Sequence, residues 1–309
     1  MIGSVLLALV PIALLIALGA VLRRAEFLAA AFWPQAERLC YYVLLPSLFV
    51  HGLATARLEG VPVFALAAVL VGSTCAVALA LVAARHRLGF RGAAFTSVFQ
   101  GGIRFNNYVG VSAAIGVFGA QGLALAAVAN AAIVPTVNIL CVLVFARFGT
   151  GERPGPAALA RQLALNPLVV ACSGGILLQA SGLALPPGIE PMLKALGQAS
   201  LPLGLLCVGA ALDLSAARTW MRPVLVSSAV KFVLLPVATV LACRAVGLHG
   251  PAAGTALIFQ VLPTASSSYI MARQLGGDAP LMAGIVAVQT ILAGLAIPLV
   301  LLALQGLAV

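Results

Sequence analysis

The stretch FQGGIRFNNYVGVSAAIG, residues 99–116, places a glycine pair, an arginine and two asparagines inside an apolar segment of helical length. A second stretch, FQVLPTASSSYIMA (residues 259–272), has a proline, a threonine and three serines at the matching depth. Glycine pairs and proline weaken a continuous helix, and a broken helix leaves backbone N–H and C=O groups without partners. In lipid, such a break is tolerated only where it lines a cavity or is buried in protein. The two stretches therefore predict a pair of interrupted helices in a membrane protein.

The composition supports a membrane protein. Hydrophobic residues make up 63% of the 309 residues, charged residues only 8%, and the mean hydropathy is +1.16. A soluble domain carries roughly a quarter charged residues, so most of the outer surface here must face membrane lipid. The net charge of +10 comes from basic residues scattered singly or in short groups between apolar stretches. This pattern is typical of topology determinants on loops and argues against nucleic acid as a partner.

The apolar segments predict an all-α polytopic protein with ten transmembrane helices. A polar, Gly/Pro-rich stretch at residues 147–161, RFGTGERPGPAALAR, separates them into two sets of five. We expect a first repeat over residues 1–150, a cytoplasmic linker over 151–162 and a second repeat over 163–309. The ten predicted ranges are 5–22, 36–54, 61–84, 93–118, 121–147, 163–182, 190–212, 222–245, 252–274 and 279–306.

The distribution of lysine and arginine predicts the orientation. Eleven arginines fall in the odd-numbered loops, whereas the even-numbered loops and both termini hold only Arg57, Lys194 and Arg244. Basic residues favour the cytoplasmic side, so we expect both termini on the outer side of a bacterial inner (plasma) membrane.

Short sequence matches between the two halves indicate an internal repeat. Three pairs recur in the same order at offsets of 155 to 160 residues: residues 19–22 with 174–177, 44–58 with 200–214, and 99–100 with 259–260. A repeat of five helices has an odd number of crossings, so the second copy must be inverted in the membrane. Inverted repeats are the architecture of many secondary transporters, whose binding site lies at the repeat interface.

The side chains at the two predicted breaks suit an anion. The N-termini of half-helices present N–H groups and the positive end of a dipole to a carboxylate. Arg104 can add a bidentate contact, and hydroxyl and amide groups can hold the remaining oxygens. The alternative is that these small and polar residues only allow close helix packing. The candidate substrate-binding residues at the breaks are Arg104, Asn106, Asn107, Pro263, Thr264, Ser266, Ser267 and Ser268.

Lys231 is a further candidate for substrate binding. It lies nine residues beyond Arg222, about 13 Å into its helix, so we expect it near the membrane centre. A cation at this depth either faces a substrate or forms structural bonds to broken backbone, and both readings remain open. The seven acidic residues are predicted at helix ends or in loops, with Glu37 beside Arg38 at the start of a helix. No acidic proton relay is therefore expected.

The sequence holds no Walker A loop, Gly-x-Ser-x-Gly or His-Glu-x-x-His motif. We therefore expect no catalytic residues, no metal site and no cofactor, and we do not expect an enzyme.

Several stretches resemble the auxin efflux carrier family, which includes plant PIN transporters and many bacterial members. The resemblance covers essentially the whole chain, in order and at similar spacing. The stretches that carry it are RFNNYVG (104–110), NPLVVACSGGILL (166–178), LPLGLLCVGAALDLS (201–215), KFVLLP (231–236) and LPTASSSYIMARQLGGD (262–278).

The resemblance implies ten helices in two inverted repeats, with the fourth and ninth helices broken where they cross. Helices 1, 2, 6 and 7 would form a scaffold, through which two chains would pair as a homodimer. Helices 3–5 and 8–10 would form a core that moves as an elevator. Asn106 or Asn107 and Pro263 would mark the crossover points, and the sequence leaves the break in the fourth helix open. The family's bacterial branch is associated with dicarboxylates such as malonate or malate, and its plant branch with indole-3-acetate.

The sequence is thus interpreted as a secondary transporter that moves a small organic anion, a mono- or dicarboxylate or an auxin-like acid, by elevator-type alternating access. One alternative is a sodium-coupled carrier of the bile-acid symporter type. A second is a membrane receptor that binds ligand without transport.

Overall fold

The computed structural model describes residues 2–55, 61–150, 155, 157, 161, 164–183, 185–212 and 221–306. Most of the linker predicted at 151–162 lies outside these residues. Every regular element in the described part of the chain is a helix, which confirms the all-α prediction. Two short π-helical turns, η1 and η2, continue into the α-helices that follow them. The elements are α1 (Ile2–Arg24), α2 (Phe32–Leu39), η1 (Cys40–Leu44), α3 (Leu45–Ala54), α4 (Val63–Leu88), α5 (Gly92–Ile103), α6 (Asn107–Phe148), α8 (Pro167–Ser181), α9 (Ile189–Ala210), α11 (Met221–Ala229), η2 (Val230–Leu234), α12 (Leu235–Val246), α13 (Gly250–Gln260), α14 (Ser267–Leu275) and α15 (Ala279–Gly306).

Within the described residues, five helical stretches are long and apolar enough to cross a membrane. Their lengths and apolar composition identify an integral membrane protein, whereas the arrangement of ten spans in two inverted repeats stays a prediction. The five stretches are Val63–Leu88, Gly92–Phe148, Ile189–Ala210, Met221–Val246 and Ala279–Val300.

Local sequence signals set several helix ends. The Asn166 side chain accepts hydrogen bonds from the backbone N–H groups of Leu168 (3.0 Å) and Val169 (3.3 Å) and thus caps α8. Helix α4 ends at Gly89, whose φ of 70° is the left-handed conformation that glycine adopts readily. Gly119, with φ of 60°, interrupts α6 at the boundary between the helices predicted at 93–118 and 121–147.

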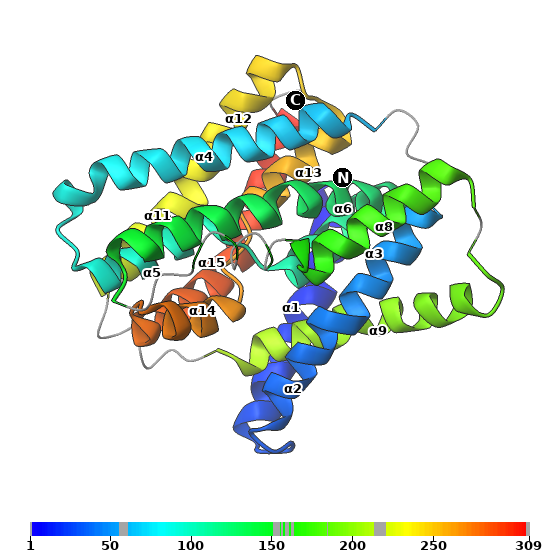
Figure 1. Cartoon of the computed structure of the whole chain (residues 1–309), viewed down its shortest axis with the longest axis horizontal. Coiled ribbons are helices and arrows are strands. Elements are labelled where there is room, and N and C mark those ends of the chain that lie inside the picture. The colour runs from blue at the N-terminus through cyan, green and yellow to red at the C-terminus, as the bar shows by residue number, and fades with distance from the viewer. Residues whose placement is uncertain are drawn as a thin grey trace.

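The helices pack in two groups (Figure 1). The first helix group consists of α1, α2–η1–α3, α8 and α9, and it is held together mainly by α9 against α1 and α3 and by α3 against α8. The second helix group consists of α4, α5, α11–η2–α12, α13, α14 and α15. Helix α6 contacts members of both groups, including α8 in the first and α4 and α13 in the second.

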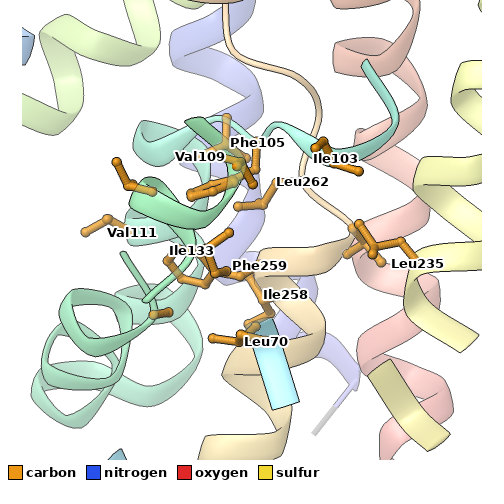
Figure 2. Packing of buried hydrophobic residues seen from close by; sticks show 14 of the residues in the cluster. Leu70, Ile103, Phe105, Val109, Val111, Ile133, Leu235, Ile258, Phe259 and Leu262 are labelled. Atoms are coloured by element: carbon orange, nitrogen blue, oxygen red, sulfur yellow. The ribbon is translucent and has the colours of Figure 1, made fainter. Parts of the chain in front are cut away.

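Apolar packing surrounds the interruption between α5 and α6 (Figure 2). The rings of Phe105 and Phe259 meet edge to face with centroids 5.8 Å apart. Leu262, which follows α13, lies close to Val109 in the first turn of α6. A Cβ on Gly110 would lie 2.5 Å from the end of the Leu262 side chain, so a larger residue at this position would have to displace Leu262. These contacts join the two interrupted segments in the buried centre of the protein.

The glycine pair that suggested a helix break also has a packing role. Gly101 and Gly102 are helical and lie in the last turn of α5, which ends at Ile103, directly before the interruption. A Cβ on Gly101 would collide with the side chains of Ser227 and Ile285, and one on Gly102 would lie 3.0 Å from Val230. The pair therefore allows α11, η2 and α15 to pack closely against α5, as small residues do in membrane helices.

Candidate functional site

The first interruption separates α5 from α6. Arg104 and Asn106 have extended backbone conformations, and the helix resumes at Asn107. The Asn106 side chain accepts hydrogen bonds from the backbone N–H groups of Tyr108 (3.0 Å) and Val109 (3.3 Å). Asn106 is thus the N-cap of α6, and its side-chain oxygen is occupied by this role. Twelve helical residues precede the break, about 18 Å of helix, which places it well inside the thickness of a bilayer.

The second interruption lies between α13 and α14, from Val261 to Ser266. Pro263 lies in this segment and is buried. The hydroxyl of Thr264 donates to the carbonyl oxygen of Gly101 at 2.9 Å. Thr264, which was predicted to bind substrate, is fully buried. Its hydrogen bond to Gly101 joins the two interrupted segments to each other.

Gln289 on α15 holds both interrupted segments. Its side-chain oxygen accepts from the Thr264 backbone N–H at 3.1 Å and lies 2.7 Å from the Thr264 hydroxyl, whose single proton is shared between this oxygen and the Gly101 carbonyl. Its amide nitrogen donates to the Gly101 carbonyl at 3.1 Å and to the Ser227 hydroxyl at 3.2 Å. One buried amide therefore satisfies backbone groups that a broken helix exposes. Gln289 was not predicted as a site residue, although an amide inside the apolar segment 279–306 is an unusual feature of the sequence.

Arg104 points from the first interruption toward α14. Its Nε donates to the Ser268 hydroxyl at 3.0 Å, and its Nη1 donates to the Asn138 side-chain oxygen at 2.8 Å. All these partners are uncharged. Across the described residues the single ion pair joins His51 and Glu190, so no described carboxylate forms an ion pair with Arg104. A half-buried guanidinium held by neutral groups is a suitable site for an anion.

Lys231 lies apart from this cluster, in η2. It is fully buried, and within the described part of the chain its ammonium group has no hydrogen-bond partner. Lys231 and Arg104 both lie near Cys141 on α6. Arg104 and Lys231 thus approach the same side chain, Cys141, but do not contact each other.

Two other candidates have less defined contacts. The side-chain oxygen of Asn107 is buried and has no partner among the described residues, and Ser267 is the first residue of α14.

Ser266 donates a hydrogen bond to the carboxylate of Glu37 on α2. Glu37 was predicted at the start of a helix, and its contact with Ser266 was not predicted. The packing of the first helix group brings the carboxylate onto the second interruption. The two residues are 229 positions apart in the chain, so no local pattern could show the contact.

An apolar pocket of about 600 Å³ adjoins both interruptions. Its lining includes Val109 of α6, Pro263, Ile12 of α1 and Ile297 of α15. The pocket offers space for an apolar group beside the polar cluster.

The comparisons with known proteins agree with this membrane architecture. Residues 157–301 match the family described as "Membrane transport protein". The chain is also 27% identical over 249 residues to a Rhizobium meliloti (strain 1021) protein named "Putative malonate transporter", an alignment that covers 76% of this chain and 75% of that protein. The second half of the chain is thus similar to membrane transport proteins, and the named relative agrees with the resemblance to the auxin efflux carrier family.

Proposed function

We propose that the chain is a secondary transporter that moves a small organic anion by elevator-type alternating access. In this proposal the first helix group is the scaffold and the second helix group, with α6, is the moving core. The binding site lies where the interruptions between α5 and α6 and between α13 and α14 meet.

The observation that carries the proposal is that Arg104 forms no ion pair within the described residues. Its guanidinium donates to Ser268 and Asn138, which are neutral. A charge at membrane depth is costly unless it is paired or faces water. A carboxylate that enters the site supplies an ion-pair partner and accepts charge-assisted hydrogen bonds from the same guanidinium.

The substrate class follows from the site and from the relative's name. A relative named for malonate favours a short dicarboxylate, and we take malonate as the first substrate to test. The apolar pocket beside Val109 and Pro263 also has space for the ring or chain of a larger acid, including an auxin-like acid.

Thermal denaturation of the purified protein tests the binding site. A ligand that binds only the folded state raises the melting temperature by mass action. We expect malonate to raise it in the wild type, whereas sodium chloride of equal ionic strength does not. Indole-3-acetate, malate and acetate are compared under the same conditions to define the substrate class.

Arg104→Ala identifies the residue responsible. Hydrogen bonds to a charged group contribute about 1.5–3 kcal/mol, so their loss should weaken malonate binding about 10- to 150-fold. Arg24→Ala, at the exposed end of α1, is the matched control and should keep the malonate shift. If Arg104→Ala retains the full shift, Arg104 is structural and the proposed anion site is wrong.

A further inference from the structure

Glu37 links the two helix groups at the second interruption. It belongs to α2, in the first helix group, and its carboxylate accepts a hydrogen bond from Ser266, the residue that precedes α14. Both residues are partly buried. A contact between a scaffold carboxylate and the moving core must change whenever the core moves.

The carboxylate lies beside the groups that would bind the substrate. Ser266 and Ser268 are two residues apart at the start of α14, and Ser268 accepts from Arg104 at 3.0 Å. The start of α14 is also the positive end of its helix dipole. The Glu37 carboxylate therefore already occupies a position that suits an anion.

Ser266 can donate only one hydroxyl proton. A substrate carboxylate that accepts this hydrogen bond must take it from Glu37. The two carboxylates would then lie close together, and like charges at such a separation disfavour ionisation of both. A proton bound between them removes this repulsion.

Few other groups near Glu37 could balance a second negative charge beside it. Cys40 and Tyr41 lie on the same helical segment, Cys207 on α9 and Tyr108 on α6, and none of these side chains is a cation. Arg104 lies near Tyr41 and is the cation that the substrate itself would engage. Arg38, the next residue along α2, is exposed.

We infer that Glu37 takes up one proton when a carboxylate substrate binds at Ser266 and Arg104. This inference rests on the proposed anion site, and it adds that the site binds a proton together with the substrate. In the empty site Glu37 is ionised and accepts from Ser266. In the loaded site the Ser266 hydroxyl donates to the substrate, and the proton from solvent resides on a Glu37 oxygen, where it offsets one of the two negative charges that the malonate dianion brings.

Proton uptake on binding is the direct test. Malonate is added to purified protein in weakly buffered solution between about pH 7 and 9, where the ligand is ionised, and the pH change is recorded with an indicator dye. We expect uptake of one proton per malonate bound. By linkage the Kd for malonate should rise with pH, by up to about tenfold per pH unit.

Glu37→Gln and Glu26→Gln separate Glu37 from other proton acceptors. Glu26 is an exposed acid after α1, so its variant should behave as the wild type. Glu37→Gln should bind malonate with no proton uptake and with a Kd that does not vary over this pH range. If Glu37→Gln still takes up the proton, the acceptor is another group, such as Lys231 or malonate itself, and the inference is overturned.

A measurement on the wild type covers the case in which Glu37→Gln does not fold. Infrared difference spectra with ¹³C-labelled malonate should show a new protonated carboxyl band that does not shift with the label. If malonate raises the melting temperature but no proton is taken up and no band appears, the role of Glu37 is wrong while the anion site stands. If no carboxylate binds at any pH, both proposals fail.

Discussion

Replacement of Gln289 by leucine should destabilise the centre of the protein. Leucine has nearly the same size, so packing is largely kept while the buried amide is lost. The change removes the acceptor of the Thr264 backbone N–H and the donor to the Gly101 carbonyl. The Thr264 hydroxyl still reaches Gly101, so that carbonyl keeps one partner, and the Thr264 N–H is the group left without one.

The expected loss in the free energy of unfolding follows from this single unpaired N–H group. A buried donor without a partner costs about 1–3 kcal/mol, and we take about 2 kcal/mol for Gln289→Leu. At about 2.1 cal/mol/K of unfolding entropy per residue, 1 kcal/mol lowers the melting temperature of a 309-residue chain by about 1.5 °C. The predicted fall is therefore roughly 3 °C.

Tryptophan or dye fluorescence during heating of the detergent-solubilised protein measures this fall. Gln198→Leu on the exposed surface of α9 is the matched control, because its side chain makes no hydrogen bond within the described residues. If Gln289→Leu melts no lower than Gln198→Leu, Gln289 does not hold the interrupted segments and the reasoning about the site's support is refuted.

Three further variants test the packing and the charges. Gly101→Ala should lower the melting temperature because its Cβ would collide with Ser227 and Ile285, whereas Gly72→Ala, whose Cβ meets nothing within 4 Å, should not; equal melting temperatures would contradict the close-packing role. Asn106→Ala should cost about 1 kcal/mol through loss of the α6 cap, and an unchanged melting temperature would show that the cap contributes nothing. Glu190→Gln should leave the melting temperature unchanged, since the pair with His51 is 3.9 Å long and half exposed at the glutamate; a fall of several degrees would show that the pair matters.

The positions of the interrupted helices could be predicted from the sequence. Pro263 removes a backbone donor, and the polar residues from Arg104 to Asn107 are unusual in an apolar span. Both signals are local, and the helices do end at Ile103 and Gln260. The break in the fourth predicted helix proved to be Arg104–Asn106, a point that the sequence had left open.

The role of Gly101 and Gly102 could not be predicted in the same way. Glycine both weakens helices and allows close helix contact, and only the neighbouring side chains decide between these effects. The structure shows Val230, Ser227 and Ile285 against the pair.

The partners of the site residues depend on tertiary contacts. The Glu37–Ser266 and Arg104–Ser268 hydrogen bonds join residues 229 and 164 positions apart. Polar side chains in apolar spans mark such residues as important, but they do not say which groups they contact. For this reason the sequence identified Arg104 and Ser268 as candidates and missed the carboxylate of Glu37.

Counterflow of radiolabelled malonate in proteoliposomes tests the central claim most directly. Vesicles that contain wild-type protein and unlabelled malonate should accumulate external labelled malonate transiently, and Arg24→Ala vesicles should do the same. Arg104→Ala should require about 10- to 150-fold more external malonate for the same initial rate. If the wild type binds malonate but shows no counterflow, the protein is a receptor, and if Arg104→Ala matches the wild type, the anion does not cross through the site at the interrupted helices.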